Sequence, residues 1–403
     1  MLTYSLQNRG KFPKYEYLYR CIKEDILSGR IPAGAQLPSK RALADHLCIS
    51  AITVEAAYGQ LLDEGYIFAR ERSGFYVNQL QLPTSHPAIG QPVPARQKII
   101  NPSAAARGAA EAQEPASRFS PAAQTTALPL GLADKKSASS PQYADFPFAS
   151  FLHIVREVLN DYRDRLPLRP PNAGTEELRS AISSYLLRYR GMSAAPEQII
   201  IGSGSEYLYG LVAQLFDRRI IYAIEGQSYE KIRLVYSAYA RPYELLPMDS
   251  CGVSSEGLRS SQAGVLHVTP FHSYPTGITA PAAKRYEYLA WAEARNAFIV
   301  EDDFESEFAV QKKPLETMYA MDHTGSVIYL NTFTKSLAPS MRVGYMVLPE
   351  RLLPAYREKL GFYSCTVPSL DQYVLAEYIS RGYLEKRLNR IRRKLRQSNP
   401  ENS

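Results

Sequence analysis

The chain has 403 residues, of which 45% are hydrophobic, so it is long enough for two domains with sizeable cores. Its apolar runs stay below the roughly 18 residues of a membrane span, and its polar N-terminus lacks the core of a signal peptide, which excludes a membrane protein and predicts a cytoplasmic one. The net charge of +7 fits a nucleic-acid partner, and four widely spaced cysteines predict neither disulfides nor a metal site.

The first eighty residues read as three helices followed by a hairpin. Apolar residues at helical spacing predict a first helix that stops at Ser28-Gly29. Ser39 is a suitable N-cap for a second helix over 40–47, and a short turn leads into a third over 51–64. Two β-rich runs around Glu71-Arg72-Ser73-Gly74 then form a hairpin with a basic tip. This order predicts a winged helix-turn-helix, whose third helix enters the major groove of double-stranded DNA.

This stretch resembles the DNA-binding domain of the GntR regulators, in Leu37-Pro38-Ser39-Lys40-Arg41 before the second helix and Gly74-Phe75-Tyr76-Val77 in the wing. The resemblance implies a DNA-binding domain over residues 10–80, and the alternative is a winged helix used only for protein contacts. The family often has an arginine where this chain has Ala51, and Glu55 follows on the same helix, so we expect modest base readout. The DNA-facing candidates are Lys40, Arg41, Ser50, Thr53, Tyr58, Arg72 and Gly74, with Arg41 and Arg72 on phosphates.

Residues 81–144 are rich in Pro, Ala, Ser and Gln and show no sustained hydrophobic period. Such a segment buries too little apolar surface to offset the entropy lost on ordering. It is predicted to be a flexible linker of about 60 residues between two domains.

Beyond residue 145, short apolar runs alternate with helical stretches, which predicts a mostly parallel α/β sheet covered on both faces. The runs lie at 199–201, 220–224, 265–268, 297–300 and 327–330. Polar and glycine residues follow these runs, so they should gather at one edge of the sheet, where ligands bind in open α/β folds. The first such group, Ser203, Gly204 and Ser205, precedes a helix whose N-terminal amides suit a phosphate, although small residues at helix starts are common.

The stretch Asn331–Tyr345 places a lysine and an arginine just after the last of these strands. A lysine desolvated at a strand end, such as Lys335, loses its proton easily enough to attack an aldehyde. The hydroxyls of Thr332 and Thr334, together with Arg342, could hold a phosphate beside it. That combination suits pyridoxal phosphate. The same spacing also fits a solvated loop lysine near an ordinary surface arginine.

The stretch resembles the Schiff-base lysine loop of fold-type I aminotransferases, and more closely the aminotransferase-like half of the MocR subgroup of GntR regulators. By this resemblance Lys335 forms the Schiff base with pyridoxal phosphate, Tyr229 stacks on the pyridine ring and Asp302 pairs with the ring nitrogen. Tyr274 stands where the enzymes usually have an asparagine that reaches the cofactor's phenolic oxygen, and Phe304 where the family has a tyrosine. Both departures predict a less well tuned cofactor than in a working aminotransferase.

The segment 383–396 reads as a basic helix, whose charges we expect on a solvated face. Proteins that it resembles continue well beyond residue 403. The expectation is therefore that residues 145–403 form an aminotransferase-like effector domain without most of its C-terminal small subdomain, including the arginine that grips a substrate carboxylate.

These patterns support three hypotheses. The first is a homodimeric transcriptional regulator that binds double-stranded DNA and senses pyridoxal phosphate, or an amine or amino acid, through Lys335. The second is an aminotransferase that acts on free amino acids. The third is a truncated, cofactor-free remnant that only binds DNA or pairs with an intact partner. The winged helix and Phe304 favour the first over the second, so we expect no efficient turnover.

Overall fold

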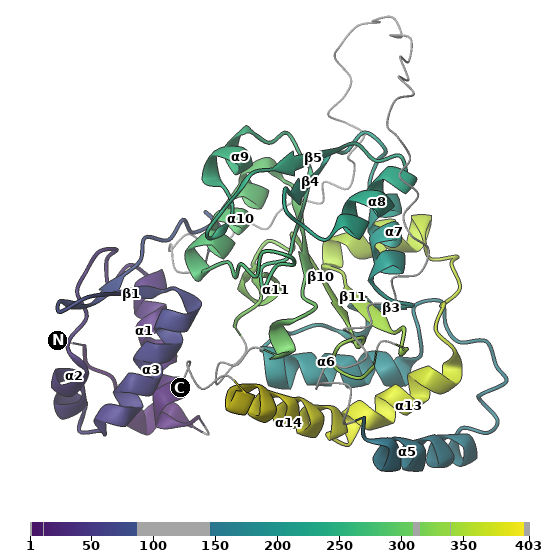
Figure 1. Cartoon of the computed structure of the whole chain (residues 1–403), viewed down its shortest axis with the longest axis horizontal. Helices are drawn as coiled ribbons and strands as arrows, with labels where there is room; N and C mark the ends of the chain where they lie inside the picture. Colours follow the sequence, from purple (N-terminus) through teal and green to yellow (C-terminus); the bar gives the residue numbers. More distant parts are fainter. Residues whose placement is uncertain (1, 11, 87–145, 309–314, 339, 399–403) are drawn as a thin grey trace, which may run out of the picture. The chain divides into compact units, whose positions relative to one another are not determined.

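The computed structural model describes residues 2–10, 12–86, 146–308, 315–338 and 340–398, which Figure 1 draws as coloured ribbon. Most of the predicted linker therefore lies outside the described residues. None of the described helices combines the length and apolar character that a membrane crossing requires. Among the same residues, no group of three or more histidine, cysteine, aspartate or glutamate side chains is placed to hold a metal ion.

The three α-helices and the two-stranded hairpin that the sequence predicts are present, and a short 3-10 helix that it did not predict precedes them. In chain order they are η1 (Leu6–Arg9), α1 (Lys14–Leu27), α2 (Lys40–Leu47), α3 (Ala51–Glu64), β1 (Ile67–Arg70) and β2 (Gly74–Val77). The hydroxyl of Ser39 accepts a hydrogen bond from the Ala42 amide and caps α2, and Ser50 caps α3 through the Thr53 amide. Leu18, Val54 and Leu61 are fully buried, so α1 and α3 share an apolar core.

The second half is built on a seven-stranded sheet whose strands follow the order β3-β11-β10-β9-β8-β4-β5. The pairs β10–β9, β9–β8, β8–β4 and β4–β5 are parallel, whereas β11 runs antiparallel to both of its neighbours. The strands are β3 (Ile199–Gly202), β4 (Tyr222–Glu225), β5 (Tyr243–Leu246), β8 (Val265–Val268), β9 (Phe298–Asp302), β10 (Val327–Thr332) and β11 (Gly344–Val347), and a separate ribbon pairs β6 (Met248–Asp249) with β7 (Gly252–Val253). The predicted α/β sheet is therefore mostly parallel, and β5 and β11 are two strands that the apolar runs did not indicate.

Helices cover both faces of this sheet (Figure 1). Side chains alternate between faces along each strand, so Ile200 packs into the layer of α7, α8 and α12, while Ile199 and Ile201 pack against α5, α6, α13 and α14. The helices are α5 (Phe148–Asp161), α6 (Glu176–Arg190), α7 (Ser205–Leu215), α8 (Glu230–Ala238), α9 (Ser255–Ser260), α10 (Ala282–Arg295), α11 (Met318–Met321), α12 (Leu353–Lys359), α13 (Ser369–Ser380) and α14 (Tyr383–Ser398), with 3-10 turns η4 (Pro196–Gln198), η5 (Ser306–Phe308) and η6 (Glu350–Leu352). Because both faces are covered, the strands read as continuous apolar runs.

Candidate functional site

The polar groups predicted from the sequence lie after the carboxyl ends of strands that point the same way. The registers pair Leu330 of β10 with Asp302 of β9, and Val268 of β8 with Glu301 of β9, so these three strands end at one edge. Strand β3 is antiparallel to β11, which is antiparallel to β10, so Gly202 at the end of β3 reaches the same edge. This edge is where open α/β sheets bind ligands.

One end of the edge is suited to an anion. Gly204 has φ 105°, a conformation that other residues rarely adopt, and a Cβ there would come within 2.6 Å of the Arg342 guanidinium and displace it. Helix α7 begins at the next residue, Ser205, with its N-terminal amides beside that guanidinium. Arg342 donates to Glu206 at 2.6 Å, and Lys231 donates to the other oxygen of the same carboxylate at 2.8 Å. Two cations and a helix N-terminus thus converge here.

The hydrogen bonds to Glu206 decide its charge. Burial opposes ionisation, but the bonds from Lys231, from the residue's own backbone amide and from Arg342 together lower the pKa of Glu206 to about 2. Ser203 belongs to the same loop and donates its amide to the Thr366 hydroxyl at 3.1 Å. Thr332 is buried at the end of β10 and Thr334 is half-buried beside Lys335.

Asp302 ends β9 as a nearly fully buried carboxylate. The Tyr209 hydroxyl of α7 donates a hydrogen bond to it, and Nε2 of His267 on β8 lies 3.6 Å from its Oδ2. The Tyr236 hydroxyl lies 2.8 Å from Nδ1 of the same histidine, whereas its buried Nε2 has no hydrogen-bond partner among the described residues. This arrangement fixes the carboxylate at the sheet edge, where it can accept a hydrogen bond from a protonated ring nitrogen.

Two tyrosines flank this edge. The ring centroids of Tyr229 and Tyr274 are 6.3 Å apart at an edge-to-face angle of 77°, and Lys231 Nζ lies 5.7 Å from the Tyr229 ring centroid. Tyr229 is half-buried, whereas Tyr274 is 60% exposed. Tyr229 is therefore anchored near the anion-binding end, and Tyr274 lies at the open side.

Lys335 lies three residues after β10, with its side chain directed at the loop that follows β9. Its Nζ forms an ion pair with Glu305 and lies 4.6 Å from the centroid of the Phe304 ring. Burial lowers the pKa of Lys335 to about 8, which brings a neutral, nucleophilic amine within reach at physiological pH. The other Glu305 oxygen lies 3.5 Å from Nε2 of His272.

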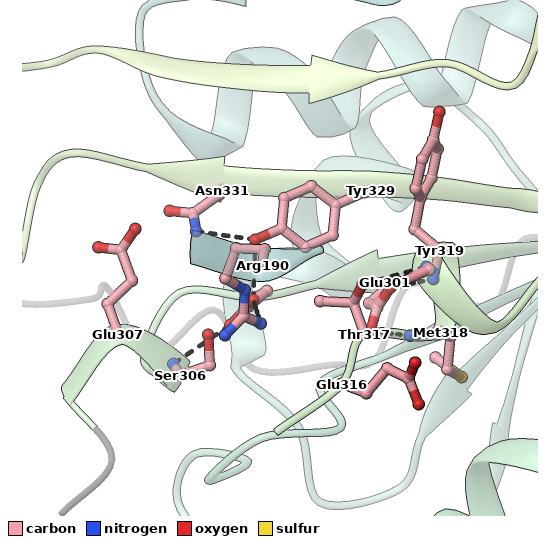
Figure 2. Close-up of polar contacts among 12 residues, drawn as sticks. Arg190, Glu301, Ser306, Glu307, Glu316, Thr317, Met318, Tyr319, Tyr329 and Asn331 are labelled. Atoms are coloured by element: carbon pink, nitrogen blue, oxygen red, sulfur yellow. Dashed lines mark hydrogen bonds and ion pairs between the residues drawn. The ribbon is translucent and has the colours of Figure 1, made fainter. Parts of the chain in front are cut away.

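A buried polar cluster surrounds Asp303, the residue after Asp302, and Figure 2 shows its members Arg190, Ser306, Tyr329 and Asn331. The Arg190 guanidinium donates to Asp303 at 2.6 Å, and the Tyr329 hydroxyl donates to the same carboxylate oxygen at 2.8 Å. Asn331 donates to the Tyr329 hydroxyl at 3.0 Å, and the Ser306 amide donates to the second oxygen of Asp303 at 3.2 Å. Asp303 is therefore no solvated neighbour of Asp302: it is a fully buried carboxylate that ties α6, β10 and the loop after β9 together.

The basic helix α14 reaches two loops of the site. Arg387 donates to the carbonyls of Ser336 at 2.8 Å and Leu337 at 3.0 Å, and Arg392 donates to the Glu307 carbonyl at 2.7 Å. Arg387 is only 6% exposed. The prediction that the charges of this helix lie on a solvated face was therefore wrong for Arg387 and Arg392, which satisfy carbonyl groups beside Lys335 and Glu305.

The DNA-facing candidates fall into two groups. Arg41 is exposed at the start of α2, and the side chain of Arg72 is 94% exposed at the wing tip, where its φ is 57°. Gly74 follows with φ 108°, which closes the hairpin. Lys40 pairs with Glu55 of α3 at 2.5 Å. The ion pair with Lys40 offsets the negative charge of Glu55 on α3, the helix predicted to enter the major groove.

Tyr58 does not face DNA. Its side chain is fully buried in the core of the helices, and its hydroxyl donates to the Pro38 carbonyl at 3.0 Å. Its position on the apolar face of α3 accounts for this burial, so Tyr58 is corrected to a core residue. Ser50 and Thr53, which cap α3, remain near the helix start and partly exposed.

Sequence reasoning missed four residues at the sheet edge. His267 carried a signal, because it is a polar residue inside the apolar run of β8. Tyr209, His272 and Glu305 carried none, since each meets its partner across at least 30 residues of chain.

Two family models match the chain. The model for bacterial regulatory proteins of the gntR family matches residues 14–77, and the model for class I and II aminotransferases matches residues 151–399. The chain is 33% identical over 97% of its length to the uncharacterized HTH-type transcriptional regulator YdeL of Bacillus subtilis, covering 79% of that protein. It is 30% identical over 96% of its length to the probable rhizopine catabolism regulatory protein MocR of Rhizobium meliloti, covering 76% of it.

A similar solved structure is that of the kynurenine aminotransferase of Pyrococcus horikoshii, determined in complex with PMP. It is similar to 62% of this chain, with 27% sequence identity and a TM-score of 0.56. The present chain spans 64% of that protein's length, less than two thirds.

Proposed function

Because the chain belongs to the gntR family of bacterial regulatory proteins, and within it to the MocR-type DNA-binding transcriptional regulators with an aminotransferase-like domain, we propose that it binds pyridoxal phosphate at the edge of the sheet and senses an effector there. The observation that carries the proposal is the position of Lys335, a half-buried lysine with a lowered pKa, just after the strand that pairs with the one ending in Asp302. The effector is pyridoxal phosphate itself, or an amine or amino acid that reacts at Lys335.

The residues present fit this cofactor. The close approach of Gly204 to Arg342, with the amides at the start of α7, supports a phosphate site that also includes Ser203 and Ser205. Thr332 and Thr334 supply further hydroxyls. Tyr229 and Tyr274 would flank the pyridine ring. When bound, the cofactor supplies an electrophilic aldehyde and a ring that accepts electrons.

Each protein group has a defined task in this site. Asp302 would keep the proton on the ring nitrogen, and the hydrogen bond from Tyr209 orients that carboxylate. Lys335 would hold the aldehyde carbon covalently. An effector that binds one conformation of the domain better than another would then shift the population of DNA-binding states.

We further propose that residues 10–80 bind double-stranded DNA through Lys40, Arg41, Ser50, Thr53, Arg72 and Gly74, and that a homodimer reads two half-sites. The exposed Arg41 and Arg72 support phosphate contacts at α2 and at the wing. The cytoplasm is the location that such a regulator requires.

The test of the cofactor proposal is chemical. The chain is loaded with pyridoxal phosphate, reduced with borohydride, digested and examined by mass spectrometry. We expect the mass of the reduced cofactor on the peptide that contains Lys335, and its loss in Lys335→Ala. Lys284, a buried lysine outside the site, pairs with Glu287 at 2.8 Å and serves as the internal control that should stay unmodified. An unmodified Lys335 peptide in the wild-type chain contradicts the proposal.

A further inference from the structure

We propose that Glu305 is a positioning residue that holds Lys335 as an ammonium ion whenever the lysine is not bonded to the cofactor, and that it thereby favours exchange of the lysine for an amine effector. The inference rests on the proposed function, because it concerns how Lys335 releases the cofactor's aldehyde carbon. It assigns a role to a carboxylate that the cofactor site itself does not require.

Two contacts of Lys335 Nζ favour its charged form and oppose the effect of burial, which lowers the pKa of the lysine to about 8. The amine forms an ion pair with Glu305, and the centroid of the Phe304 ring lies 4.6 Å away. A carboxylate and an aromatic face both attract an ammonium ion and neither stabilises a neutral amine. The two groups are consecutive in the chain, so the loop after β9 presents them together.

Glu305 is held in place by its own loop. Its carbonyl accepts a hydrogen bond from the Phe308 amide at 2.9 Å, and the Ser306 amide is bound by Asp303 at 3.2 Å. Asp303 is in turn fixed by Arg190. These bonds fix the backbone that carries Glu305, and the second oxygen of its carboxylate lies 3.5 Å from Nε2 of His272.

In the exchange of Lys335 for an amine effector, the Glu305 carboxylate would pair with the ammonium ion that forms on Lys335. The effector enters as an ammonium ion. With the cofactor bound, a C=N double bond between the effector's nitrogen and the aldehyde carbon would replace the one between that carbon and Lys335 Nζ, and the three hydrogens of the effector's ammonium group would end on Nζ. Lys335 then becomes an ammonium ion, which Glu305 receives, so no further reactant is needed.

The same contact suppresses catalysis after exchange. Transamination requires a neutral amine that takes a proton from the effector's α-carbon. A lysine held as an ammonium ion beside Glu305 cannot accept that proton. Glu305 thus separates binding of an amine, which a sensor needs, from turnover, which consumes the effector.

The experiment compares wild type, Glu305→Gln and the control Glu358→Gln, a carboxylate exposed on α12. Two readouts are used on the full chain. The first is the equilibrium constant for exchange with methylamine in the cofactor-loaded protein, followed by visible absorbance. The second needs no cofactor: it is the pH dependence of acetylation of Lys335 by acetic anhydride before loading, followed by mass spectrometry.

In Glu305→Gln we expect the exchange constant to fall by about tenfold and acetylation of Lys335 at pH 7 to become about tenfold faster, as one unit of lysine pKa requires. Glu305→Asp keeps the charge and should lie between the two proteins, and Glu358→Gln should match wild type. If the exchange constant and the acetylation rate are unchanged in Glu305→Gln, the role proposed for Glu305 is overturned, while the proposed function is not affected. A wild-type chain that takes up no pyridoxal phosphate contradicts the proposed function instead, while the labelling profile still decides whether Glu305 holds the ammonium ion.

Discussion

At the scale of single residues, the sheet contains buried acids that ionise near neutrality. Burial raises the pKa of Glu225, Glu301 and Glu307 to about 7 in each case, despite hydrogen bonds that favour the charged form. In Glu225 one oxygen accepts all three bonds, from the amide and hydroxyl of Thr269 and the hydroxyl of Ser273. A glutamine amide can keep that acceptor oxygen, so the titration can be removed without removing the bonds.

We expect the free energy of unfolding to fall as the pH rises from about 4.5 through about 7, because the folded chain holds protons there that the unfolded chain has released. The stabilisation is complete below the unfolded pKa and is lost as the pH passes the folded pKa. In Glu225→Gln the slope should be shallower by up to one proton, about 1.4 kcal/mol per pH unit. Urea unfolding at pH 5, 6, 7 and 8 measures this, and parallel profiles for the two proteins contradict the pKa of Glu225.

Which residues could be predicted depends on where their partners lie. Lys335, Asp302 and Gly204 stand directly after apolar runs, so the sequence marks them as edge residues, although their roles stay predictions until tested. Tyr58 was misplaced because the same helix carries both the apolar face and the DNA-facing side, and a tyrosine fits either. Glu305 could not be found, since only folding brings it to Lys335.

At the scale of elements, the three N-terminal helices and the hairpin end where caps and glycines predict, because local chemistry sets those ends. Ser39 and Ser50 cap their helices, and Gly65 closes α3 with φ 79°. Strands β5 and β11 escaped prediction because β5 has a polar residue in a short run and β11 follows a loop rather than a helix. Hydrophobic periodicity does not show that β11 runs antiparallel between two parallel strands.

The second helix leads to a prediction about DNA binding. Arg41→Ala should weaken affinity for all sequences alike and reduce the slope of log affinity against log salt by about 0.9, as loss of one phosphate contact requires. Arg20→Ala is the matched control, because Arg20 is exposed but pairs with Glu16 within α1. Fluorescence anisotropy at several salt concentrations measures both. If the salt dependence of affinity in Arg41→Ala equals that of wild type, Arg41 does not contact the DNA backbone.

At the scale of the whole molecule, a regulator and an enzyme differ in the fate of a bound amino acid. We expect transfer of the amino group from common α-amino acids to be slower than in a working aminotransferase by about 10² to 10⁴, the usual contribution of a positioned general base. Phe304 lacks a hydroxyl, and Glu305 pairs with the lysine that would act as the base.

Stopped-flow absorbance with a panel of amino acids checks this expectation, with keto acid release as the second signal. Phe304→Tyr restores the hydroxyl and should raise the rate, whereas Tyr363→Phe, a matched change outside the site, should not. Rapid release of keto acid by the wild-type chain would support the aminotransferase hypothesis over a regulator without turnover.

Helix α14 connects the loops around Lys335 to a more distant part of the domain. Its 16 residues span about 24 Å, and Arg387 and Arg392 grip carbonyls on the two loops that carry Lys335 and Glu305. Arg387 and Arg392 lie about one and a half helical turns apart on α14. A small separation of the two loops would therefore act unequally on these two positions of a stiff helix. Such a separation would tilt α14, and the part of the helix far from both contacts would then move farther than the loops.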